Sequence, residues 1–416
     1  MASSFHYAHL ADLHLGSWRD QKMRDLSTKA FLTAIDNCIQ TKVDFILFAG
    51  DLFNTSLPSL DTLKIVAKKL KELHEHQIPL YVIPGSHDFS PSGKTMLDVL
   101  ENAGLLKNVC KGTINLETKE LELKWTIDQK TEAKITGILG RRGLLDKSYY
   151  ENLSRTNLEQ ESGYKIFMFH TTITELVPKS LSMIDSQPLS FLPKNCNYYA
   201  GGHIHHPVKL ELPEYPLVAY TGALFPNNFP EIEQYSTGSY YLINVENNQQ
   251  TIKTIPLDLI KHIPLELDCS HKSPEIIMYD ILNQFQNKDL TDTIITLRLH
   301  GTITHGKVSD INFKEIFDQL YKQNAYFIMK NTSKLTSEEF AEIKTSASNP
   351  ETIESETIQE HLQQLKTFEK DIELQLIQSL LHSLNTSKNE GEHILDFQKR
   401  IMSELNKILN LEISAN

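Results

Sequence analysis

Five short polar clusters, each directly after an apolar run of strand length, constrain this chain more than any other feature of its sequence. In chain order they are Asp12-Leu13-His14, Gly50-Asp51, Gly85-Ser86-His87-Asp88, Phe169-His170 and Gly202-His203-Ile204-His205. Each cluster offers a carboxylate oxygen or an imidazole nitrogen, the atoms that bind metal ions in proteins. The pattern therefore predicts a sheet whose strands deliver metal ligands at their carboxyl ends.

The segments between the clusters predict the architecture that carries them. Phe45–Ala49 is wholly apolar, which is typical of a strand covered on both faces. Residues Thr28–Thr41 and Leu60–His76 have apolar side chains at helical spacing. Strands and helices alternate through about residue 240 and are followed mainly by strands. This order predicts an α/β sandwich with helices outside two central sheets.

At 416 residues the chain is too long for one ordinary core, so several domains are expected. Residues 1–250 hold all five clusters, and residues 251–332 alternate as a small βαβαβ domain. Residues 333–357 are rich in Ser, Thr and Glu, as in a linker. Residues 358–416 carry two apolar stripes at helical spacing and predict a helical hairpin. Those stripes need a partner, which is either the rest of the chain or another subunit.

The composition excludes several classes of protein. No apolar run approaches the roughly eighteen residues of a membrane span, and the first residues do not resemble a secretory signal. Four widely spaced cysteines without a CxxC pair predict reduced thiols in a cytoplasmic protein. A net charge of −12 argues against indiscriminate binding to polyanions. A nucleic-acid substrate stays open, because basic residues gather locally, as at Arg141 and Arg142.

The spacing within the clusters points to the chemistry. Asp12 and His14 are two residues apart, so their side chains point the same way at the end of an extended strand. His203 and His205 repeat this spacing after Gly201-Gly202, where the backbone can approach the site closely. Aspartate and histidine without thiolate favour manganese, iron or zinc over calcium. With one shared carboxylate the set suffices for two ions about 3.5–4 Å apart, a spacing that clamps a reacting phosphoryl group.

The five clusters, with the run from His9 to Gly16, resemble the calcineurin-like metallophosphoesterases. Within them the chain most resembles the nuclease subunit of the DNA double-strand-break repair complex, the meiotic-recombination-eleven or SbcD family. The resemblance implies a four-layer αββα sandwich, a small α/β capping domain that closes over DNA, and a C-terminal helical hairpin that docks a coiled-coil ABC-type ATPase. It also implies a manganese-dependent nuclease of the nucleoid, with single-strand endonuclease and 3′-to-5′ double-strand exonuclease activity. The helices at 28–41 and 60–76 have enough apolar surface to permit a homodimer.

The resemblance also assigns roles to single residues. The first manganese ion would be held by Asp12, His14, Asp51 and His205. The second would be held by the bridging Asp51 together with Ser86, His170 and His203. His87 would stabilise or protonate the departing oxygen, and Asp88 would orient His87.

Departures from the family pattern, among them Ser86 and Asn54, leave alternatives open. Ser86 stands where the superfamily has an Asn that ligates the second metal, and a serine hydroxyl is shorter and a poorer donor. Asn54 stands where many nuclease members have a His. The alternatives are a phosphodiesterase for small nucleotides, against which the extra domain and hairpin argue, and a repair-complex scaffold whose second metal site is too weak for catalysis.

Overall fold

The computed structural model describes residues 4–90, 95–178, 184–337, 358, 362, 370–389, 392 and 394–409. Two compact units make up the chain, residues 1–337 and residues 338–416. The five polar clusters all lie in the first unit.

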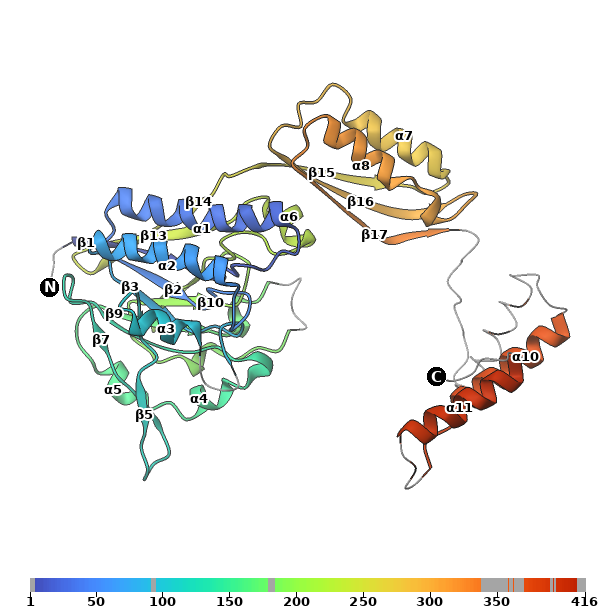
Figure 1. The fold of residues 1–416 in the computed structure, drawn as a ribbon. Helices are drawn as coiled ribbons and strands as arrows, with labels where there is room; N and C mark the ends of the chain where they lie inside the picture. Colours follow the sequence, from blue (N-terminus) through green and yellow to red (C-terminus); the bar gives the residue numbers. More distant parts are fainter. Residues whose placement is uncertain are drawn as a thin grey trace. The chain divides into compact units, whose positions relative to one another are not determined.

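Two six-stranded sheets form the centre of the first unit (Figure 1). The first sheet has the order β14 (Gln249–Pro256), β13 (Ser239–Glu246), β1 (Ser4–Leu10), β2 (Phe45–Ala49), β3 (Leu80–Ile83) and β4 (Lys107–Asn108). The second has the order β11 (Val208–Leu212), β12 (Tyr215–Tyr220), β10 (Tyr198–Gly202), β9 (Lys165–His170), β8 (Lys134–Ile138) and β7 (Thr126–Ile127). Strands β1 to β4 are mutually parallel, and so are β8, β9, β10 and β12. Ligand-bearing turns therefore follow the carboxyl ends of parallel strands in both sheets.

Helices cover the outer faces of both sheets and complete a four-layer αββα sandwich, as the sequence predicts. The helices of the first unit that precede β13 are α1 (Gln21–Thr41), α2 (Leu60–Glu75), α3 (Met96–Asn102), α4 (Lys147–Glu151), α5 (Thr156–Glu159) and α6 (Phe229–Tyr235). A small hairpin of β5 (Gly112–Ile114) and β6 (Leu121–Leu123) is added to them. One apolar core packs α1, α2 and α3 on the first sheet, and another packs α4 and α5 on the second. Between the sheets a third core is rich in aromatic rings, among them Tyr7, Phe45, Tyr81 and Tyr198.

The helix boundaries follow local capping. Helix α1 begins seven residues before the predicted start, because the Asp20 side chain accepts hydrogen bonds from the backbone of Lys22 and Met23. It ends at Thr41, because the next residue, Lys42, has a left-handed backbone. Helix α2 begins after Ser59, whose side chain caps Thr62 N, and spans the predicted segment to within one residue.

Residues 261–337 form the predicted βαβαβ fold, named here the three-stranded segment. Its parallel sheet has the order β15 (Lys261–Asp268), β16 (Thr293–Ile303) and β17 (Phe327–Ser337), with α7 (Pro274–Gln284) and α8 (Phe313–Lys322) packed on it in a core of their own. Ser273 caps the start of α7, since its hydroxyl accepts a hydrogen bond from Ile276 N.

The two boundaries drawn around this segment require correction. Residue 250 lies inside β14, which pairs with β13 along its whole length, so the first sheet continues to Pro256. The linker predicted to begin at 333 begins later, because β17 continues to Ser337. Leu335 is buried in the core there, and Ser337 pairs with Ile303. The alternating polar residues of β17 face solvent, which made an edge strand look like a linker in sequence.

The described residues of the second unit form helices α10 (Lys370–Leu384) and α11 (Ile394–Leu409), which pack on each other. The Ser383 hydroxyl donates to the Glu404 carboxylate across the pair. Most of the predicted linker and of the first apolar stripe before residue 370 lies outside the described residues. In the described parts of the chain, no helix has the length and apolar character needed to cross a membrane, and all four cysteines are free thiols.

Candidate metal centre

Two neighbouring turns carry the first ligands and are joined by backbone hydrogen bonds. Asp12 N donates to Gly50 O at 3.2 Å, and His14 N donates to Asp51 O at 2.9 Å. These bonds continue the β1–β2 pairing beyond the strands, which fixes the turn after β1 against the turn after β2. The Asp12, His14 and Asp51 side chains are thereby held at one edge of the first sheet.

Four of the predicted ligands have a left-handed backbone. The φ angles are 52° at Asp12, 43° at His14, 53° at Asp51 and 91° at His203. Such conformations cost about 1–3 kcal/mol each in a residue other than glycine, and they cluster at functional sites. The strain is held by the surrounding fold, since both carboxylate oxygens of Asp12 accept from His203 N at 3.0 Å.

Glycine allows the turns to come this close. Gly50 has φ of 91°, and a Cβ there would overlap the ring of His170. A Cβ on Gly202 would overlap the carbonyl oxygen of Ala49 in the other sheet. The two sheets can therefore bring their ligands together only with glycine at these positions.

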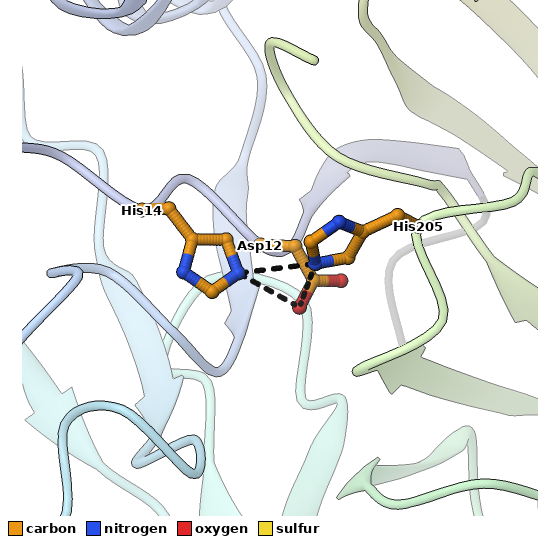
Figure 2. A group of neighbouring side chains, drawn as sticks. All are labelled: Asp12, His14 and His205. Atoms are coloured by element: carbon orange, nitrogen blue, oxygen red, sulfur yellow. Dashed lines mark hydrogen bonds and ion pairs between the residues drawn. The ribbon is translucent and has the colours of Figure 1, made fainter. Parts of the chain in front are cut away.

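Asp12, His14 and His205, named here the His205 set, point their donor atoms at one another (Figure 2). The two imidazole Nε2 atoms are 3.1 Å apart, and each lies 3.9 Å from Asp12 Oδ1. Asp12 and His14 are buried, and His205 is partly exposed. The structure thus brings these three predicted ligands together.

Asp51 lies between the His205 set and the ligands of the second sheet. Its Oδ2 atom is 3.6 Å from His14 Nε2 and 3.2 Å from His170 Nε2. Asp51 is 2% exposed, so no bulk water screens these contacts. One carboxylate oxygen between two imidazoles from different sheets is the position that a bridging ligand requires.

His170, His203 and Ser86, named here the His170 set, are less closely gathered. His170 Nδ1 donates to Ala49 O at 2.8 Å, which turns Nε2 toward Asp51. The His203 ring lies edge-on to His170, with 5.2 Å between the ring centroids. The described residues contain three groups of three His and Asp side chains in which the donor atoms lie within 4.8 Å of one another. His203 belongs to none of these groups. The Ser86 hydroxyl donates to Asp51 Oδ2 at 3.4 Å.

His87 stands beside the ligands, and its ring is oriented by a backbone group. Its Nδ1 lies 2.8 Å from the carbonyl oxygen of Asn54, and one ring nitrogen lies within 4.8 Å of donors on His14 and Asp51. The exposed guanidinium of Arg142 reaches to 3.4 Å from the same Nδ1. The orienting contact predicted from Asp88 is therefore made instead by the main chain of Asn54.

Asp88 has a different set of partners. Its carboxylate accepts from the backbone N of Leu52, Phe53 and Gly85 at 3.0–3.1 Å. Asp88 thus ties the turn that carries Asp51 to the turn that carries His87, and its action on His87 is indirect.

Burial and neighbouring charge shift the pKa values of the ligands. Burial raises the pKa of Asp12 to about 6 and lowers that of His14 well below its ordinary value. Burial alone would lower the pKa of His170, but the adjacent Asp51 carboxylate raises it to about 10. Burial alone would raise the pKa of Asp51. The neighbouring imidazoles of His170 and His14 outweigh burial, so the pKa of Asp51 falls far below its ordinary range. Without a metal ion, the contact between His170 and Asp51 therefore holds a proton at neutral pH.

These donors fit a divalent cation. The Nε2 atoms of His14 and His205 are 3.1 Å apart, and their lone pairs repel each other unless a proton or a cation lies between them. His170 Nε2 is buried and lies 3.2 Å from a carboxylate oxygen of Asp51, so the two donors face the same point. Oxygen and imidazole ligands together suit manganese, iron or zinc.

Sequence reasoning missed Glu231, which contacts a ligand directly. Its Oε1 atom lies 2.9 Å from His205 Nδ1. The available signal was the spacing from Asn228 to Glu231, which is the N-cap and N3 pattern of a helix start. His9, by contrast, is not a ligand: it is buried between the sheets, where Nδ1 contacts the Tyr198 hydroxyl at 2.7 Å.

Comparison with known proteins agrees with this geometry. Residues 5–207, which include all the predicted ligands, match the family described as calcineurin-like phosphoesterase. Similar proteins described as DNA double-strand break repair protein Mre11 come from Archaeoglobus fulgidus (30% identity, 52% of this chain and 49% of that one) and Methanococcus maripaludis (30%, 48% and 51%). A third, from Methanocaldococcus jannaschii, is 26% identical over 91% of this chain and 95% of its own.

The matches to the first two relatives span about half of their length. The ligand-bearing turns lie within the matched residues, and the four-layer fold continues beyond them to Pro256. Residues 5–207 thus match the calcineurin-like phosphoesterase family over the part of the chain that carries every predicted ligand.

Proposed function

We propose that this protein is a manganese-dependent DNA nuclease that hydrolyses phosphodiester bonds in double-strand-break repair. The observation that carries the proposal is the position of Asp51 Oδ2, between His14 Nε2 at 3.6 Å and His170 Nε2 at 3.2 Å. A shared carboxylate is what two-metal phosphoesterase chemistry requires. The relatives described as break-repair proteins supply the substrate class.

The chain's own residues have distinct parts in this reaction. Asp12, His14, Asp51 and His205 would hold one ion, and Asp51, His170 and His203, with Ser86, would hold the other. Bound divalent cations polarise the phosphoryl group and offset the charge that develops on it. His87 protonates the departing oxygen, a role that an imidazole fills near neutral pH. Arg142 adds a positive charge beside His87 for a phosphate oxygen.

The other surfaces support a role within a complex. The hairpin of α10 and α11 leaves large apolar side chains exposed, with Leu395 70% and Ile394 66% accessible. We assign this surface to a coiled-coil ABC-type ATPase, and we assign residues 261–337 to closure over DNA. Beside α2, Leu57 and Leu60 are 72% and 83% accessible and supply apolar area for a homodimer.

One observation favours a second candidate, a repair-complex scaffold with weak catalysis. The Ser86 hydroxyl donates to Asp51 Oδ2, the same oxygen that would bridge two ions. A scaffold would bind one ion in the His205 set and leave the His170 set poorly filled.

A cleavage assay with manganese tests the proposal. Circular single-stranded DNA reports endonuclease action, and duplex DNA labelled at one end reports exonuclease action and its polarity. We expect cleavage of both by the parent and none by Asp51→Ala. Activity that survives Asp51→Ala would come from another protein and would contradict the assignment.

Two comparisons separate the candidates. Cleavage of bis-p-nitrophenyl phosphate or of a cyclic dinucleotide without cleavage of DNA would favour a small-nucleotide phosphodiesterase. An inactive parent with an active Ser86→Asn variant would favour the scaffold. Glu214→Gln is the matched control, since it removes only a surface ion pair with Lys194.

A further inference from the structure

Helix α6 lies between a metal ligand and the three-stranded segment. It has seven residues, Phe229–Tyr235, and begins at Asn228, whose side chain caps Glu231 N. Its side chains contact His205 and His206 on one side and β15 and β16 on the other.

Glu231 is the contact to the ligand, and its carboxylate is itself firmly held. Oε1 lies 2.9 Å from His205 Nδ1 and accepts from Asn228 Nδ2 at 2.6 Å. Oε2 accepts from Asn227 N at 2.8 Å. The carboxylate has therefore little freedom to rotate, and the imidazole that it contacts is fixed with it.

This contact settles which nitrogen of His205 faces the metal centre. A carboxylate beside Nδ1 keeps the proton there, so Nε2 presents its lone pair toward Asp12 and His14. A carboxylate also raises the basicity of the imidazole as a ligand. The adjacent His206 is held by the same helix, since its Nδ1 lies 2.6 Å from the Tyr235 hydroxyl.

The opposite contacts of α6 hold the three-stranded segment. Arg298 of β16 forms a bidentate pair with Glu233, with its Nε at 3.1 and 3.0 Å from the two carboxylate oxygens. The guanidinium also stacks over Phe229, 5.2 Å from the ring centroid. At the end of the helix the Ser236 hydroxyl contacts His262 Nδ1 at 2.9 Å. Glu231 and Glu233 are two residues apart on one short helix, so displacement of one contact moves the other.

We propose that Glu231 is a positioning residue for His205, and that helix α6 couples the affinity of the His205 set for its cation to the docking of the three-stranded segment. The first part rests on the proposed function only for the nature of the ligand, a divalent cation. The second makes the segment that is assigned to DNA a regulator of metal loading.

Manganese titration by calorimetry on the full chain tests the first part without any nuclease assay. Loss of such an orienting partner typically costs about 10- to 100-fold in metal affinity. We expect this loss in Glu231→Ala, and we expect Glu231→Gln, whose amide oxygen still accepts from Nδ1, to recover most of it. Circular dichroism without metal checks that each variant is folded.

A double-mutant cycle with His205 separates positioning from a general structural role. If Glu231 acts through His205, Glu231→Ala has no further effect on manganese affinity once His205→Ala is present. An unchanged affinity in Glu231→Ala, or an equal loss in both backgrounds, would overturn the assignment.

Arg298→Ala and Glu233→Ala test the coupling. Each removes the ion pair between α6 and the segment and leaves Glu231 in place, and we expect a manganese affinity about 2- to 30-fold weaker, with the double variant no weaker than either one. Lys272→Ala is the control, since it breaks an ion pair with Asp280 inside the segment. Parent affinity in both variants would overturn the coupling. These affinity measurements do not depend on nuclease activity. A protein that cleaves no DNA but shows these changes in manganese affinity would still confirm the coupling through α6.

Discussion

The His205 set and the His170 set use the same kinds of ligand and differ in how firmly they are held. In the His205 set three donors face one another, and Glu231 braces the imidazole from outside. In the His170 set, His170 lies 3.2 Å from Asp51 and the Ser86 hydroxyl lies 3.4 Å from it, whereas the His203 ring contacts only the edge of His170 at 5.2 Å between centroids. Ligands of the same kinds therefore do not give two sites of equal affinity. Bracing by neighbouring side chains and the fourth ligand decide their relative affinity.

The largest effect is expected from Asp51→Ala, which removes the carboxylate that lies between the His205 set and the His170 set. Loss of both ions removes several kcal/mol of transition-state stabilisation, which corresponds to a cleavage rate lower by about a thousandfold or more. Single-turnover cleavage and a manganese titration on the same sample measure it. A variant that keeps one strong site and cleaves DNA would show that the sets are independent.

Removal of the His87 imidazole should leave metal binding by both sets intact and lower only the rate of the chemical step. A positioned general acid contributes about 10²- to 10⁴-fold. We therefore expect slower cleavage by His87→Ala at parent manganese affinity, with the parent's dependence on pH altered. A large loss of manganese binding would instead place His87 among the ligands, as its proximity to His14 and Asp51 would permit.

Metal binding to the His170 set should depend on pH, because His170 carries a proton that the metal must displace. Asp51 raises the pKa of His170 to about 10, so at neutral pH the metal must displace a proton from it. Because the group is protonated below its raised pKa and free above it, affinity should rise with pH, by up to about tenfold per unit for one released proton. Titrations of His205→Ala at pH 7 and pH 8 measure this, with the heat compared in buffers of different ionisation enthalpy. An affinity that does not change with pH would contradict the proton near Asp51.

The smallest effect is expected from Ser86→Asn, which should strengthen the weaker set. An amide oxygen reaches further than a hydroxyl, and we expect about tenfold tighter binding of the second ion, within the range of a single supporting ligand group. Ser86→Ala is the control that removes the hydroxyl and adds nothing. Equal affinity in all three proteins would mean that Ser86 has no part in the His170 set.

Much of this arrangement is predictable from the sequence because it depends on periodicity. Buried apolar runs identify the strands, and parallel strands necessarily deliver the residues that follow them to one edge, as Asp12, Asp51 and His170 show. The four-layer fold and the meeting of the His205 set follow from that rule.

The rest depends on contacts between distant parts of the chain. The left-handed backbone of Asp12, His14, Asp51 and His203 is imposed by hydrogen bonds between separate turns. The approach of Glu231 to His205 requires α6, whose Ile232 packs in the core of the first sheet, to reach the turn after β10 of the second sheet, and no local sequence pattern predicts this contact. Asp88 also bonds to distant backbone, at Leu52 and Phe53.

Anomalous diffraction at the manganese edge tests the central claim, that one centre holds two unequal sites on a shared Asp51. Crystals would be grown with one equivalent of manganese and with an excess. We predict one peak among Asp12, His14, Asp51 and His205 at one equivalent, and a second peak beside His170 only in excess. Equal occupancy of both positions at one equivalent, or first occupancy beside His170, would contradict the account.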